Sequence, residues 1–225
     1  MFLKVALLVL QKDVAIERRN GEIALTTLLF AVSSVLVFSI AFVVEGQPID
    51  GAAAGILWLA VIYAGQLALG RTFERERYGE TMKALLMAPA SRPAIYVGKL
   101  LGMVVLMLAL EAILVPMVAF LFQAPFFERP LLLAALLVTG TIGFASVGTL
   151  FAAMLIRSRA RDIMLPILLY PVTIPVIIAG VRGTAALLQS PPNPEMAVFW
   201  IAVLGAFDVV FVTLALWTFD PLMTE

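Results

Sequence analysis

Six long apolar runs dominate the sequence and decide its fold class. The first, residues 23–44, holds 22 residues without a charge. As an α-helix it would measure about 33 Å, which is enough to cross a hydrocarbon core of about 30 Å. Five similar runs follow, at residues 52–70, 100–122, 131–156, 163–181 and 198–218. We therefore predict an all-α polytopic membrane protein with six transmembrane helices, in a single transmembrane domain over residues 1–225.

The composition excludes a soluble domain and several kinds of site. Hydrophobic residues make up 63% of the chain and charged residues 13%, with a mean hydropathy of +1.07, as in integral membrane proteins. The chain contains no Cys and no His, which removes thiolates and the commonest metal and haem ligands. The Gly-Lys pair at residues 98–99 lacks the rest of a phosphate-binding loop. We expect no metal site, no nucleotide site and no catalytic activity in this chain.

Residues 1–19 are predicted to form a helix that lies on the membrane surface. At 100° per residue, four cations gather on about a third of the helix circumference: Lys4, Lys12, Arg18 and Arg19. A basic stripe of this kind suits lipid headgroups, although Asp13 and Glu17 interrupt the other side.

The cations are shared unequally between the two sides of the predicted bundle. If the amino terminus is cytoplasmic, 13 Lys and Arg side chains lie on that side: four in residues 1–19, six in residues 71–99 and three in residues 157–161. Only Arg129 and Arg182 lie on the other side. The positive-inside rule therefore predicts that both termini and the segment 71–99 face the cytoplasm.

The central segment, residues 71–99, is too long and too charged to be a simple turn between two spans. It carries six Lys or Arg and three Glu. Within it, residues 84–87 read A-L-L-M and are followed by Pro89 and Pro93, which we expect to stop a short half-apolar helix. Two interpretations follow from the residues: a solvated loop that dips into the membrane interface, or a helix that docks in a groove of a soluble partner.

Three polar side chains lie inside predicted spans: Gln66, Glu111 and Asp208. An ionised carboxylate at mid-depth costs at least about 2.5–3.5 kcal/mol, so each acid should face the interior of the bundle and find a partner. The two acids are candidates for a proton or substrate relay, or for groups that only fix helix packing.

Three prolines interrupt the fifth span: Pro166, Pro171 and Pro175. Each removes a backbone donor, and the carbonyls left free need partners inside a membrane. We expect this span to be kinked, buried in protein and a candidate hinge, and we expect an irregular loop at residues 182–195.

Several ordered patterns resemble one family over essentially the whole chain. E-R-E-R-x-G-E at residues 74–80, L-L-x-A-P-x-S-R at 85–92 and I-Y-x-G-K at 95–99 resemble the cytoplasmic coupling loop of ABC-2-type exporter permeases. K-D at 12–13, E-R-R at 17–19, R-x-R-A-R at 157–161, L-P at 165–166, I-P-V-I at 174–177 and G-A-F-D-V-V-F at 205–211 are similar to the haem exporter B family of bacterial cytochrome c maturation.

The resemblance implies a permease subunit, with the ABC-2-type exporter fold, in a bacterial inner membrane. It implies that the following residues couple to an ATPase: Glu76, Gly79, Glu80, Ala84, Leu85, Leu86, Pro89 and Arg92. The implied partners are a cytoplasmic ATPase that holds ATP and Mg, a haem-handling membrane subunit with a small accessory subunit, and a periplasmic haem chaperone. It also implies a dimeric permease unit, and no nucleic acid. ATP hydrolysis would then drive haem delivery or release of the haem-loaded chaperone, with haem ligated by the partners.

Three other functions remain open from the residues. An ABC-2-type permease for a drug, a lipid or a polysaccharide would share the fold and the ATPase contact. An ion-coupled secondary transporter would use Glu111 and Asp208 and need no ATPase. A scaffold within an assembly would move no substrate.

Overall fold

The computed structural model describes residues 2–44, 47–48, 51–78, 91–158 and 160–222. Nearly all of this part of the chain is helical. The helices are α1 (Phe2–Asn20), α2 (Glu22–Phe42), α3 (Ala52–Tyr78), α5 (Arg92–Leu121), α6 (Pro130–Met154), α7 (Arg161–Leu188) and α8 (Pro194–Leu222). A short 3-10 helix, η1 (Leu155–Arg157), precedes α7, and the two-residue strands β1 (Val43–Val44) and β2 (Gln47–Pro48) pair antiparallel after α2.

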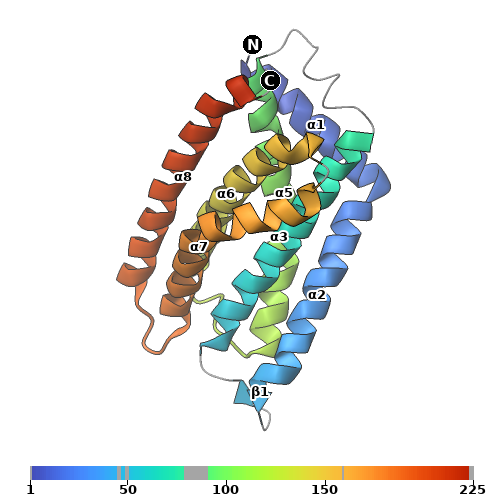
Figure 1. Cartoon of the computed structure of the whole chain (residues 1–225). Coiled ribbons are helices and arrows are strands. Elements are labelled where there is room, and N and C mark those ends of the chain that lie inside the picture. Colours follow the sequence, from blue (N-terminus) through green and yellow to red (C-terminus); the bar gives the residue numbers. More distant parts are fainter. Residues whose placement is uncertain (1, 45–46, 49–50, 79–90, 159, 223–225) are drawn as a thin grey trace.

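The helices from α2 to α8 are each long and apolar enough to cross a membrane. They confirm the predicted all-α polytopic fold with six spanning helices. Figure 1 shows these helices side by side in an elongated bundle, with α1 lying across one end. The start of α1, the end of α3, the start of α5 and the end of α8 all lie at that end, and the β1–β2 hairpin lies at the other.

The centre of the bundle is formed by α3 and α6, most of whose residues are buried, whereas α8 and α2 are largely exposed. On α3, Ala60, Ala64 and Ala68 are fully buried along one side. Small residues at every fourth position let neighbouring helices approach closely, which is how helices associate where the surrounding solvent is itself apolar.

Two helices extend into the central segment from its two sides. The second span was predicted to end at residue 70, but α3 continues to Tyr78, since the Arg and Glu residues there are good helix formers. The third span was predicted to begin at residue 100, but α5 begins at Arg92. Pro93 was expected to stop a helix, and it instead lies in the first turn of α5, where a missing N–H is tolerated.

The fifth span differs from its prediction in length and in exposure. Helix α7 contains all three prolines and continues to Leu188, so the loop expected from residue 182 begins later. Figure 1 shows α7 bent as expected: its first part crosses in front of α3 and its second part runs along the bundle. Ile163, Ile167 and Ile174 are exposed, so the prediction that this span is buried in protein is wrong for the single chain.

The bend of α7 has a local cause besides its prolines. Thr173, between Pro171 and Pro175, donates its hydroxyl to the carbonyl of Leu169 at 2.9 Å. A Thr side chain that bonds back to the preceding turn favours helix bending. These residues therefore concentrate the bend in the middle of α7.

Candidate functional site

The first part of the central segment is the end of α3, and its last part is the start of α5. Of the residues predicted to couple to an ATPase, Glu76 lies near the end of α3 and Arg92 begins α5. Gly79, Glu80, Ala84, Leu85, Leu86 and Pro89 lie outside the described residues. We use the term junction for the packing of α1, the end of α3, the start of α5 and the start of α7 at this end of the bundle.

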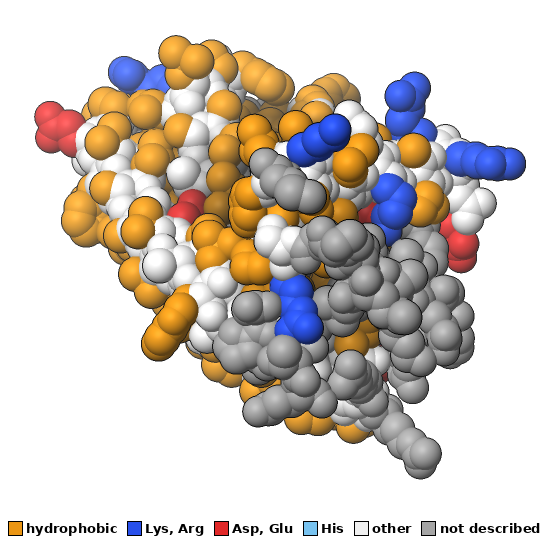
Figure 2. Space-filling view, turned by 90° about the horizontal axis from the view of Figure 1, so that it is seen from above, with side chains coloured by type: hydrophobic (Ala, Val, Ile, Leu, Met, Phe, Trp, Pro, Cys, Tyr) orange, Lys and Arg blue, Asp and Glu red, His pale blue; other side chains and the backbone are white. Residues whose placement is uncertain are grey.

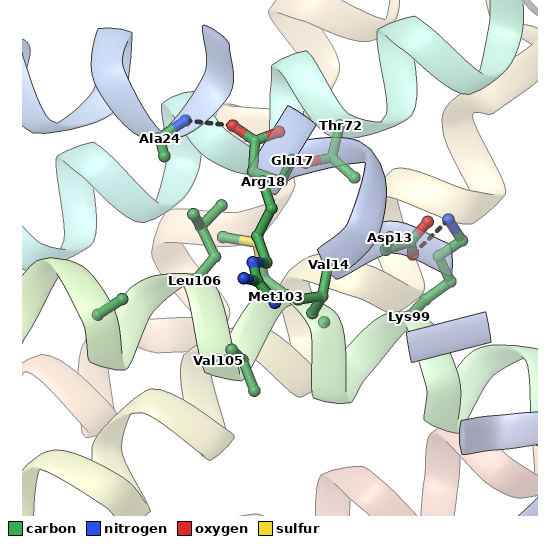
Figure 3. Close-up of a pocket in the computed structure, with 12 residues that line it drawn as sticks. Asp13, Val14, Glu17, Arg18, Ala24, Thr72, Lys99, Met103, Val105 and Leu106 are labelled. Atoms are coloured by element: carbon green, nitrogen blue, oxygen red, sulfur yellow. Dashed lines mark hydrogen bonds and ion pairs between the residues drawn. The ribbon is translucent and has the colours of Figure 1, made fainter. Parts of the chain in front are cut away.

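An ion pair fastens α1 to α5 in the junction. Lys99 of α5 is only 4% exposed, and its Nζ donates to Asp13 Oδ2 of α1 at 2.7 Å. Figure 3 shows the two side chains extending toward each other. Lys12 Nζ lies 3.0 Å from the other carboxylate oxygen of Asp13. Asp13, expected only to interrupt the side of α1 opposite its basic stripe, therefore anchors the helix.

A glycine allows α1 to approach α5 at this point. A Cβ at Gly98 would lie 2.6 Å from Cβ of Val9 and 2.7 Å from the carbonyl oxygen of Ala6. Real Cβ atoms are not found at such distances, so the backbone contact requires glycine. One turn later, a Cβ at Gly102 would lie 3.6 Å from Asp13 Oδ2, which is an ordinary contact.

A buried arginine fastens the start of α7 to α3. Arg161 is 2% exposed, and its Nη2 donates to the carbonyl oxygens of Leu69 at 3.3 Å and Gly70 at 2.9 Å. Its guanidinium also lies over the ring of Phe73, 5.9 Å from the centroid. Helical carbonyls have a second lone pair available for such a donor. The predicted basic loop at residues 157–161 thus ends in a buried anchor.

The exposed cations of this end lie around the junction. Lys4, Arg18 and Arg19 of α1 are exposed. Seen from the end that carries both termini, Lys and Arg side chains are spread over the face (Figure 2). The end of the bundle that carries both termini therefore has exposed cations on its surface, as predicted for the cytoplasmic side.

The three intramembrane polar groups each contact a neighbouring helix. Gln66 of α3 accepts a hydrogen bond from the hydroxyl of Tyr170 of α7. Glu111 of α5, 2% exposed, accepts one from Thr141 of α6.

Asp208 of α8 makes a different contact, against a glycine. Its Oδ1 lies 2.8 Å from where a Cβ of Gly143 would be, and this oxygen is buried without a hydrogen bond to the described residues.

The two intramembrane acids meet different sides of α6. Glu111 contacts position 141 and Asp208 contacts position 143. Residues two apart on an α-helix are turned by about 200°, so α6 lies between the acids. Among the described residues no hydrogen bond joins the two, and this arrangement favours packing over a direct carboxylate pair.

Two buried aromatic side chains connect the junction's helices to the bundle centre. Trp58 of α3 donates its indole N–H to Thr184 of α7 at 2.9 Å, and its ring lies where Gly140 and Gly180 leave space. Tyr96 of α5 donates its hydroxyl to the carbonyl of Ser146 of α6 at 3.0 Å. These hydrogen bonds couple the position of α3 to that of α7 and the position of α5 to that of α6.

Sequence reasoning missed the anchors of the junction. Lys99 was counted with the cations of the central segment, and Arg161 with those of a loop. A lone cation beside Gly98 and Gly102 at the start of a span was the available signal for Lys99. Among the described residues, no group of three or more acidic side chains is placed to hold a metal ion.

Comparison with known proteins gives a consistent result. Residues 4–221 match the family model described as CcmB protein. The heme exporter protein B of Pseudomonas aeruginosa is 26% identical over 199 residues, which cover 88% of each chain. The heme exporter protein B of Rhodobacter capsulatus is 29% identical over 160 residues, which cover 68% of this chain and 72% of the relative.

Proposed function

This chain belongs to the CcmB family, and we infer that it is a permease subunit of the haem exporter of cytochrome c maturation. The observation that carries this inference is the family match over residues 4–221, together with two relatives named heme exporter protein B. The six spanning helices make it a multi-pass membrane protein. It acts as a component of a transporter.

We propose that the subunit is driven by a cytoplasmic ATPase that binds the segment 79–90. Residues 84–87 form a short apolar run between charged flanks in the sequence, which suits insertion into a groove of a soluble protein. The chain has no phosphate-binding loop of its own, so ATP and Mg belong to the partner. The end of the bundle that carries both termini then faces the cytoplasm of a bacterial inner membrane.

Movement of the segment would pass to the bundle through the junction. Helices α3 and α5 leave the segment on its two sides, so a displacement of residues 79–90 pulls on both. The Asp13–Lys99 pair makes α1 follow α5, and the Arg161 contacts make the start of α7 follow α3. The bent middle of α7, at Pro166, Pro171 and Pro175, is the proposed hinge.

Haem in this proposal is substrate, ligated by partner subunits. The chain has no His and no Cys, which leaves only Met and Tyr among the usual axial ligands. The partners would be a haem-handling membrane subunit, its small accessory subunit and a periplasmic chaperone, with the permease in a dimeric unit. A purified subunit that shows a haem Soret band with an axial ligand of its own would contradict this assignment.

The test is to place a charge in the apolar run of residues 84–87. Leu85→Asp and Leu86→Asp should lower cytochrome c assembly and the assembly-linked ATPase activity, while the chain still inserts in the membrane. Phe127→Asp is the control, because Phe127 is 62% exposed in the turn at the other end of the bundle. Normal assembly in both segment variants would contradict the coupling proposal.

A further inference from the structure

A cavity of about 270 Å3 lies beside the junction, between α1 and α5. Its polar part is lined by Asp13, Glu17, Arg18 and Lys99. Its apolar part is formed mainly by α5, with Met103, Val105, Leu106 and Ala109. Charged groups at one end and an apolar strip at the other are the two features of a phospholipid site, where headgroup and acyl chain need different surroundings.

Three of the four charged side chains that line the cavity are already engaged within the protein. Lys99 and Asp13 bind each other at 2.7 Å. Glu17 turns toward the start of α2, where its Oε1 accepts a hydrogen bond from the amide N–H of Ala24 at 2.8 Å. These contacts fix the walls of the cavity.

Arg18 differs from these groups. It makes no hydrogen bond or ion pair with the part of the chain that the structure describes, and it is exposed. Figure 3 shows its side chain extending from α1 toward the stretch of α5 that carries Met103, Val105 and Leu106. A guanidinium aimed into a cavity offers donors in the geometry that phosphate accepts.

The apolar strip continues from this cation along α5. From Gly102 to Ala109 the helix rises about 10 Å. Val105 is 46% exposed, Leu106 is partly exposed and Ala109 is exposed, whereas Met103 is buried. The strip is therefore open from Val105 to Ala109, and Met103 forms its floor near Arg18. A hydrocarbon chain lying there would cover the apolar side chains of α5 that lie next to α1.

We propose that this cavity binds an anionic phospholipid, with its phosphate at Arg18 and an acyl chain along residues 102–109 of α5. The lipid fills the wedge between α1 and α5 and holds α1 in place beside the Asp13–Lys99 pair. This site does not depend on the coupling proposal, because its occupant comes from the membrane and its walls are mainly α1 and α5, with Ala24 of α2 and Thr72 of α3 also lining it.

The test uses photoactivatable phosphatidylglycerol and phosphatidylcholine, each with the reactive group on the acyl chain, in vesicles that contain the assembled membrane complex. Adducts are mapped by mass spectrometry. Phosphatidylglycerol should label residues 102–109 about fivefold more than phosphatidylcholine, the size expected for one basic residue near an anionic surface. Equal labelling by the two lipids would overturn the proposal.

The variants separate Arg18 from the general basic surface of α1. Arg18→Gln should abolish the preference for phosphatidylglycerol, and Arg18→Lys should keep it. Arg19→Gln is the matched control, since Arg19 is the next exposed cation and does not line the cavity. The proposal is wrong if Arg18→Gln keeps the preference or if Arg19→Gln removes it equally.

A second variant tests the acyl strip without touching the charge. Val105→Trp places a large side chain on the exposed strip and should lower labelling of the neighbouring α5 residues by both lipids. Unchanged labelling there would place the acyl chain elsewhere and overturn the proposal.

Discussion

Asp13 of α1 and Lys99 of α5, 86 residues apart in the chain, form an ion pair of 2.7 Å with Lys99 almost fully buried. A charge held this way is costly to leave without its partner, since removing one member of a buried pair typically costs about 3–5 kcal/mol. The pair therefore makes the position of α1 depend on α5, the helix that leads out of the central segment.

Asp13→Asn should lower stability more than replacement of both charges. The single change removes the Asp13 carboxylate from the buried ammonium of Lys99, with a loss toward the lower end of about 3–5 kcal/mol because Asp13 is partly exposed. Asp13→Leu combined with Lys99→Met removes both charges and should recover part of the loss. Thermal unfolding of the purified complex measures both variants. A double variant less stable than Asp13→Asn would show that the pair does not act as a unit.

Gly98→Ala should disturb the packing of α1 on α5, whereas Gly102→Ala should be tolerated. The added methyl at Gly98 would meet Val9 and the backbone of Ala6 below 3 Å, and at Gly102 it makes only ordinary contacts. Limited proteolysis between α1 and α2 reports detachment of α1. Equal cleavage of the two variants would contradict the close approach at Gly98.

Arg161→Gln should destabilise the junction, because a hydrogen bond from a charged donor is worth about 1.5–3 kcal/mol. The substitution removes the donors to the carbonyls of Leu69 and Gly70. Arg182→Gln is the control, since Arg182 is exposed on the same helix. We expect a lower melting temperature for the first variant and an unchanged one for the control; equal melting temperatures would argue against the anchor.

Glu111→Gln should leave cytochrome c assembly intact, while Glu111→Ala should reduce the amount of folded protein. The Gln carbonyl can still accept the hydrogen bond from Thr141, but it cannot carry a proton through the membrane. Assembly is measured by haem staining, and the amount of chain in the membrane by immunoblot. Loss of assembly with Gln at a normal protein level would instead favour the relay.

The fold class could be predicted from the sequence because apolar run length alone identifies spanning helices. Helix ends could not. The stretch 71–78 is charged like a loop, yet it continues α3, since helix propensity does not depend on burial. Arg182 suggested a loop as well, and α7 continues past it. Charged residues indicate where the chain leaves the membrane, but a helix can continue past that point.

The junction could be predicted only in part. The cations of the central segment were visible, but the partner of Lys99 lies in α1 and the acceptors of Arg161 are backbone carbonyls of α3. Contacts between distant segments leave no local pattern in one sequence. The same holds for Glu111 and Asp208, whose placement on different sides of α6 follows from helix packing.

The central claim is that a cytoplasmic ATPase binds the segment 79–90 of this permease. Because the chain has no native Cys, a single Leu86→Cys variant gives one defined cross-linking position, and Glu128→Cys, exposed in the turn at the opposite end, gives its control. In native membranes, a thiol-specific cross-linker should join position 86 to a nucleotide-hydrolysing subunit, and position 128 to none. A position 86 that reacts only with reagents in the periplasm, or that is joined to no such subunit, would contradict the account.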